Sequence, residues 1–312
     1  MSAPSIRKSP ARFSMPKLTY RVWKVWRRNA DVFTKTAKVN FFPSLLEPIL
    51  YLLAFGFGLG GFISNINGQS YLAFIGPALV AIAIMNGAFF ECTFASFVRM
   101  YYQKTFDAIV ATPVSVEEVV AGELLWGATR STVNSTIVLA VIAAFGLIKS
   151  PLFLLVIPLA FFGGLLFASI AMCFTAVSPS IDFFNFPTFL FLTPMFFLSG
   201  TFFPLTSLPT AAQGTAIAVL PLTHIVNITR GVVSGHLEPI LGLSPVTLIA
   251  VSLAWIIGVT LFFFVLFSPH FYCRLVGLSL EEYFGLCKQS HPDSDTDYRD
   301  SSFIDRGGFN LH

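Results

Sequence analysis

The sequence predicts an all-α integral membrane protein with six transmembrane helices, an N-terminal amphipathic interfacial helix and a cytoplasmic hairpin. Composition is the first reason, because 55% of the 312 residues are hydrophobic and 11% are charged. With a mean hydropathy of +0.75, too little polar surface remains to coat a soluble globule. Run length is the second reason, because a helix needs about 20 apolar residues to cross a bilayer. Continuous apolar runs also argue against a transmembrane strand barrel, in which polarity alternates.

Each element follows from its own stretch of sequence. The six predicted spans cover residues 41–62, 71–97, 124–147, 151–177, 183–203 and 244–267. The predicted domains are a flexible N-terminal segment (1–16), an amphipathic helix (17–40), the six-span domain (41–270) and a polar cytoplasmic tail (271–312). We expect the tail to be disordered because aspartates and serines dominate it. A regulatory or docking role for the tail is the alternative.

The distribution of basic residues predicts the orientation. Ten of the nineteen lysines and arginines fall in the first forty positions, and Arg99 and Lys104 follow the second span. The opposite loops carry only Lys149 and Arg230. Because basic residues favour the cytoplasmic side, both termini are predicted to be cytoplasmic. The run that starts at Phe41 is too long for a cleavable signal, so it is predicted to remain as the first span.

The segment before the first span has helical periodicity. Charged residues, all basic except Asp31, recur every three or four positions from Lys17 to Lys38, and Val22, Val25 and Phe33 follow the same period on another face. Tryptophans beside cations suit the headgroup layer of a membrane. The pattern predicts a membrane-resting anchor helix, with additional contact to a cytoplasmic partner as the sharper interpretation.

Residues 97–123 separate two apolar runs and are rich in charge and tyrosine. We expect the second span to continue past Arg99 towards Ala111, and the chain then to turn at Thr112–Pro113. A capping box is predicted from Ser115 to Glu118, which would start the next helix. Three aromatic residues here, Tyr101, Tyr102 and Phe106, are predicted to be exposed for protein docking. The alternative is a merely solvated turn.

Two charges lie inside predicted spans at matching depth. Glu91 and Arg130 are each about 10–12 Å from the hairpin end at a rise of 1.5 Å per residue. Charged groups in membranes usually face the bundle and pair, so a Glu91–Arg130 contact is predicted. The alternatives are that each side chain extends separately to the cytoplasmic surface, or that Glu91 lines a wet pathway.

Motifs for covalent chemistry are missing from the sequence. The chain has no phosphate-binding loop, no cluster spaced for a metal and no nucleophile–base set, so no catalytic residue is predicted. Its four cysteines lack CxxC spacing and are interpreted as packing residues. An intramembrane enzyme is therefore disfavoured. A secondary transporter or channel would need ion-relay residues and often an inverted repeat, and no convincing repeat is present.

Three separated motifs carry a family resemblance. They are "VRMYYQKTFDAIVATPVSVEEVVAGELLWGATRS", "LTPMFFLSGTFFPLTSLP" and "PLTHIVNITRGVVSGH". In this order around six spans, they resemble the type-2 ABC exporter permeases, and within them the NodJ branch associated with lipo-chitooligosaccharide export. The resemblance covers roughly residues 17–270. The residues before Met15 and the polar extension after about Cys273 depart from the shorter family members.

The resemblance implies a homodimer in a bacterial inner membrane, bound to two copies of an ABC ATPase subunit. ATP and Mg would bind the ATPase, this chain would bind no cofactor, and nucleic acid is not an expected partner. The implied coupling helix comprises Met100, Tyr101, Tyr102, Gln103, Lys104, Thr105, Phe106 and Asp107. The implied connecting helix includes Arg21, Trp23, Lys24, Trp26 and Arg28.

The resemblance also implies short helices or re-entrant structure on the outer side, between the fifth and sixth spans. Prolines and glycines interrupt this segment, which is too apolar for a free loop. The predicted outer gate includes Pro204, Pro209, Pro221 and His224, and a simple lid is the alternative. His224 is interpreted as a satisfied interfacial histidine and not as a ligand. An amphiphilic substrate, such as a lipid-linked or acylated saccharide, would suit the Phe-rich, nearly uncharged route.

Overall fold

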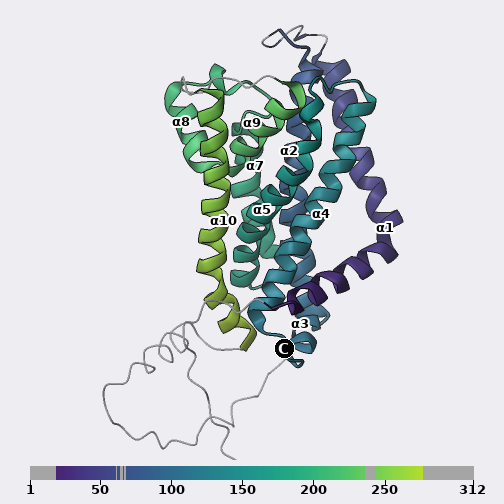
Figure 1. Ribbon diagram of the computed structural model, residues 1–312, viewed down its shortest axis with the longest axis vertical. Helices are drawn as coiled ribbons and strands as arrows, with labels where there is room; N and C mark the ends of the chain where they lie inside the picture. The colour runs from purple at the N-terminus through teal and green to yellow at the C-terminus, as the bar shows by residue number, and fades with distance from the viewer. Residues whose placement is uncertain (1–18, 61, 64–65, 67, 236–243, 277–312) are drawn as a thin grey trace, which may run out of the picture.

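The computed structural model describes residues 19–60, 62–63, 66, 68–235 and 244–276. Within these ranges the chain is an upright helical bundle without a regular sheet (Figure 1). The longer helices are α1 (Arg21–Leu53), α2 (Tyr71–Phe90), α4 (Val116–Ala144), α5 (Val156–Val177), α8 (Thr210–Val219), α9 (Pro221–Ser234) and α10 (Pro245–Val276). The predicted all-α class is confirmed.

Shorter helical turns connect or extend these helices. They are η1 (Ala54–Leu59), η2 (Glu91–Ala95), η3 (Val98–Tyr102), α3 (Thr105–Val110), η4 (Pro151–Leu155), η5 (Ile181–Phe184), α6 (Asn185–Pro187), η6 (Thr188–Leu192), α7 (Thr193–Leu198) and η7 (Leu205–Ser207). Several of these turns hold wide, π-helical hydrogen bonds. Such turns are rare and often mark functional places in helices.

Four helical stretches of the described chain are long and apolar enough to cross a membrane: Tyr71–Tyr102, Pro151–Val177, Ile181–Leu198 and Val246–Phe263. A fifth is added if α8 and α9, bent by 97° at their junction, count as one span. The first predicted span contains only a shorter apolar helix, Ser44–Gly56. The third predicted span lies in α4, whose 29 residues are long enough to cross a membrane but include several polar groups. The described residues thus support a multi-span bundle without establishing six spans.

Helix α2 is the centre of the bundle. It packs against α4, α5 and α9, and nearly all of its side chains are buried. By contrast, only 22% of the Ile181–Leu198 stretch and 17% of Val246–Phe263 in α10 is buried. Because exposed apolar helices need lipid or protein against them, these elements form the outside of the bundle.

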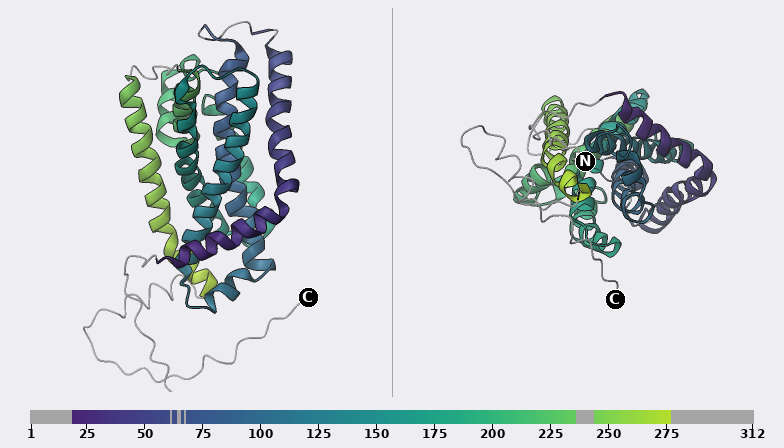
Figure 2. Two further views of the ribbon diagram at one scale, coloured as in Figure 1. Left: turned by 45° about the vertical axis from the view of Figure 1, so that its right-hand side comes forward. Right: turned by 90° about the horizontal axis from the view of Figure 1, so that it is seen from below.

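Helix α1 joins the predicted amphipathic segment and the start of the first predicted span in one helix. Its N-terminal part crosses the lower end of the bundle, and the remainder stands beside the other helices (Figure 2). Val22 and Val25, on the predicted apolar face, are buried within the protein, whereas Trp23 and Lys24 are exposed. Amphipathicity therefore directs the lower part of α1 against the bundle.

Two predicted boundaries were wrong. The second span does not continue to Ala111, because Lys104 adopts a left-handed conformation (φ 51°) that ends η3 and redirects the chain into α3. The fifth predicted span ends at Leu198 and not at 203, where Gly200 takes a positive φ of 74°. Left-handed backbone interrupts a right-handed helix, and neither break was evident from hydropathy.

Candidate functional site

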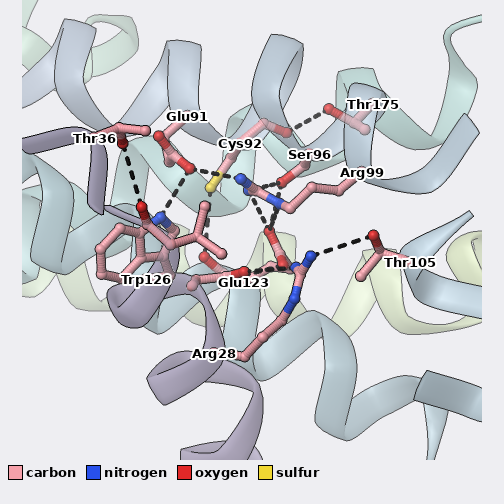
Figure 3. Close-up of polar contacts among 12 residues, drawn as sticks. Arg28, Thr36, Glu91, Cys92, Ser96, Arg99, Thr105, Glu123, Trp126 and Thr175 are labelled. Atoms are coloured by element: carbon pink, nitrogen blue, oxygen red, sulfur yellow. Dashed lines mark hydrogen bonds and ion pairs between the residues drawn. The ribbon is translucent and has the colours of Figure 1, made fainter. Parts of the chain in front are cut away.

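A buried ionic cluster lies where α1, η2, η3 and α4 meet at the lower end of the bundle (Figure 3). We define the cluster as Asn29, Glu91, Ser96, Arg99, Glu123 and Trp126. Arg99 is its only cation: Nη1 lies 2.9 Å from Glu91 Oε1, and Nη2 lies 2.5 Å from Glu123 Oε2. One guanidinium thus bridges acids on two different helical elements, η2 and α4.

Glu123 is the most enclosed member of the cluster, with a side chain 0% exposed. Its Oε2 accepts hydrogen bonds from Ser96 Oγ at 2.8 Å and from both Nε and Nη2 of Arg99. Its Oε1 accepts from Asn29 Nδ2 at 2.8 Å. A buried carboxylate is tolerated when its oxygens are satisfied in this way. Glu123 therefore connects α1, the lower end of the second predicted span and α4.

Glu91 is the second acid of the cluster. Its Oε1 accepts from Arg99 Nη1 and, at 2.8 Å, from Trp126 Nε1. The predicted Glu91–Arg130 contact is therefore absent from the described structure, where Arg99 pairs with Glu91. The Arg130 guanidinium instead lies 4.3 Å from the centre of the Phe33 ring. Arg99, eight residues after Glu91 in the same helical run, pairs with Glu91 in place of Arg130 because its guanidinium contacts Glu91 and Glu123 together.

The predicted hairpin cap is confirmed. Ser115 N donates to Glu118 Oε2 at 2.9 Å, and Glu118 N donates to Ser115 Oγ at 3.3 Å. Thr19 N and Oγ1 also donate to Glu118 Oε1, and Arg21 donates to the Pro113 carbonyl. Burial raises the pKa of Glu118, but the hydrogen bonds from Thr19 and Ser115 outweigh it and leave the pKa below its ordinary value. The hairpin is thus fastened to the start of α1.

The aromatic residues of the hairpin differ from the prediction. Phe106 is fully buried inside this chain, and Tyr101 is partly buried and stacks on Phe97 at 4.4 Å between ring centres. Only Tyr102, 65% exposed, presents the expected aromatic surface. The prediction that Phe106 is exposed for docking was wrong, because α3 turns this side chain into the bundle. Met100 is also buried.

The other predicted hairpin residues remain accessible. Lys104 and Asp107 are exposed and lie 3.9 Å apart between charged atoms, while Gln103 is exposed. Thr105 Oγ1 accepts a hydrogen bond from Arg28 Nη2 at 3.3 Å. This bond links the predicted coupling residues directly to the predicted connecting helix.

The remaining connecting-helix residues divide between surface and interior. Trp26 Nε1 donates to Thr129 Oγ1 on α4 at 2.9 Å, and the exposed Trp23 stacks on Trp26 with centres 4.1 Å apart. Lys24 lies over the ring of Tyr20. Helix α1 is therefore held to α4 by hydrogen bonds as well as by apolar contacts.

At the opposite end of the bundle, the predicted outer-gate residues organise short helices. Pro204 and Pro209 precede η7 and α8, and Pro221 begins α9. Buried His224 contacts Ser252 Oγ through Nδ1 at 2.9 Å and the Ile217 carbonyl through Nε2 at 2.8 Å. His224 is thus satisfied, as predicted, and no group of metal-binding residues occurs in the described chain.

The sequence analysis did not predict the positions of three charged residues. Glu123 was not selected, although it is an acid within an apolar stretch. Glu47, in the first predicted span, was also omitted and is exposed on α1 beside a small cavity. Arg230 was counted as a loop residue but is buried in α9, where it donates to Gly200 O at 2.8 Å. Acids surrounded by apolar residues were the available signal for Glu123 and Glu47.

These features define a helical membrane protein with a charged, tightly fastened hairpin at one end and broken helices at the other. The chain belongs to the ABC-2 type transporter family, whose characteristic sequence it matches over residues 20–233. Its relatives include Nodulation protein J of Rhizobium meliloti (strain 1021), 38% identical over 211 residues, covering 68% of this chain and 80% of that protein. They place the chain in the NodJ branch of the type-2 ABC permeases.

Two further relatives extend this comparison. Nodulation protein J of Bradyrhizobium diazoefficiens is 38% identical over 218 residues, which cover 70% of this chain and 83% of that protein. The inner membrane transport permease YadH of Escherichia coli (strain K12) is 24% identical over 245 residues, covering 78% of this chain and 92% of that protein.

Proposed function

We propose that this chain is the membrane subunit of an ATP-driven exporter whose ATP is hydrolysed by a separate ABC ATPase. The observation that carries the proposal is the direct connection from hairpin to bundle through Arg28–Thr105 and the buried cluster. A force applied at α3 would move α1, η3 and α4 together, since charged hydrogen bonds in a buried site resist separation. Family membership supports the same role.

In this proposal two copies of the chain form six-span subunits with both termini in the cytoplasm of a bacterial inner membrane. Two ATPase subunits bind ATP and Mg and contact the hairpins. The coupling surface includes exposed Tyr102, Gln103 and Lys104, together with the exposed positions of α3. Approach of the ATPase subunits would then change the packing of the first, second and fifth spans between the two copies.

We propose an amphiphile, such as a lipo-oligosaccharide or lipid-linked saccharide, as the substrate. The choice follows from the resemblance to the NodJ branch, and the abundance of exposed phenylalanines on the bundle fits it. The bent α8–α9 pair would act as the outer gate around Pro204, Pro209 and Pro221. A nearly uncharged route would favour acyl chains over small ions.

Reconstitution tests the central proposal. The full chain, coexpressed with each ABC ATPase of its source cell, is purified through a tag on the chain. We expect one ATPase to copurify and to hydrolyse ATP faster with an acylated oligosaccharide in the vesicles. Transport driven by an ion gradient without nucleotide would instead support a secondary transporter, for which Glu91 and Glu123 would be the candidate ion-relay residues. Their pairing with Arg99 argues against that role.

A further inference from the structure

A cavity of about 430 Å³ opens between the lower part of α1 and the bundle, beside the buried cluster. Its lining includes the three arginines Arg28, Arg99 and Arg130, while Val32, Phe33 and Phe94 contribute apolar surface. The cavity thus combines cationic groups with an apolar wall at the end of the bundle where the amphipathic helix lies.

The charges around this cavity are unbalanced. Arg99 is neutralised by Glu91 and Glu123. Arg28 and Arg130 form no ion pair with any carboxylate of the described residues; Arg28 instead donates to the neutral oxygens of Asn29 and Thr105. Three arginines against two acids leave one excess positive charge around a partly enclosed space.

The geometry also leaves Arg130 available to an anion. Its guanidinium carbon lies 4.3 Å from the centre of the Phe33 ring, and its N–H groups donate to no acceptor among the described residues. Arginine edges match the oxygens of phosphate groups. Glu91, the only acid among the described residues that line the cavity, already accepts hydrogen bonds from Arg99 and Trp126.

We propose that this cavity binds one anionic phospholipid of the cytoplasmic leaflet, with its phosphate between Arg28 and Arg130 and its acyl chain along Val32, Phe33 and Phe94. The orientation in this proposal rests on the proposed function, since the cytoplasmic leaflet carries the anionic lipids. The lipid completes the contact between α1 and the bundle and is bound, not transported.

Native mass spectrometry of the purified full-length chain tests the site by titration with phosphatidylglycerol or phosphatidylcholine of the same acyl chains. We expect one phosphatidylglycerol to bind at least about tenfold more tightly than phosphatidylcholine, since each basic group near an anionic lipid contributes severalfold. The double substitution Arg28→Gln with Arg130→Gln should reduce this preference to near parity. The matched control, Lys24→Gln with Arg27→Gln, removes the same charge from exposed positions on α1 and should retain the preference.

A second variant, Val32→Trp, fills the cavity without removing charge and should also abolish the preference, which provides a test if the arginine variant does not fold. Equal binding of both lipids to the unaltered chain, or unchanged preference in the arginine variant, would overturn the proposal. Displacement of the lipid by equimolar inorganic phosphate would overturn the lipid assignment in favour of a soluble anion. Because neither ATPase nor transport is measured, failure here is distinguishable from failure of the exporter proposal.

Discussion

The two acids of the buried cluster differ in how far they are enclosed and in how many side chains donate hydrogen bonds to them. Glu123 is fully enclosed and accepts from three side chains, whereas Glu91 is partly exposed and accepts from two. When an enclosed acid loses its charge, water cannot reach the site to replace the carboxylate as the acceptor for its hydrogen-bond donors. The cost of a substitution should therefore follow enclosure and not merely the presence of an ion pair.

We expect Glu123→Gln to lower the free energy of unfolding by about 3 kcal/mol, because it disrupts a buried ion pair. Glu91→Gln should cost about 1 kcal/mol, since Arg99 keeps Glu123. Thermal unfolding of the purified chain in detergent would measure both, with Glu117→Gln in the same hairpin as the control. Equal losses for Glu91 and Glu123 would contradict the enclosure argument.

Phe106 and Tyr102 offer a second contrast at the residue scale. Phe106→Ala should destabilise this chain itself by about 3–5 kcal/mol, the usual cost of truncating a buried phenylalanine. Tyr102→Ala should leave folding unchanged but weaken ATPase binding by about 2 kcal/mol if the ring is an interface anchor. Unfolding and ATPase pull-down are measured on both variants. A stable Phe106→Ala chain that loses only the ATPase would restore the original docking prediction.

At the scale of elements, α1 approaches α4 closely because Gly122 has no side chain. A Cβ at position 122 would lie 2.6 Å from Val25 Cβ and 3.2 Å from the Val22 carbonyl oxygen. Neither group can move without shifting α1, since one is a branched side chain at its base and the other is backbone. Glycine thus permits the contact through which the amphipathic helix meets the bundle.

Gly122→Ala is therefore expected to separate α1 from α4 and to destabilise the chain by about 1–3 kcal/mol, as overpacking usually does. The matched control is Gly214→Ala on α8, where an added Cβ meets no atom within 4 Å. The control should be neutral or slightly stabilising, because alanine favours helix. Protease sensitivity of α1 and thermal unfolding would report the difference. If both substitutions behave alike, close packing at Gly122 is not required.

At the scale of the whole molecule, the sequence predicted the helical class and the Ser115–Glu118 cap, because these depend on local periodicity and spacing. It did not predict which charges meet. Arg99 reaches two acids only after the π-helical turns and the contact between η2 and α4 have set its direction. The left-handed conformation of Lys104 likewise turns Phe106 inward, and hydropathy does not predict that turn.

Orientation is the property on which the proposed function of the whole molecule depends. Lys104 is exposed on the hairpin, and Lys149 is exposed in the segment that joins α4 to η4, where its backbone N–H donates to the Val233 carbonyl of α9. The end of α4 that leads into this segment is opposite to the hairpin (Figure 1). We expect Lys149→Cys to react with a membrane-impermeant maleimide added to intact spheroplasts, whereas Lys104→Cys should react only after permeabilisation. The unaltered chain, with its native cysteines, provides the background. Because basic residues are concentrated before the first span and on the hairpin, and only Lys149 and Arg230 were assigned to the opposite loops, the positive-inside rule predicts this pattern. The reverse pattern would put the hairpin outside the cell, where no ATP-driven subunit could reach it, and would exclude the proposed exporter mechanism.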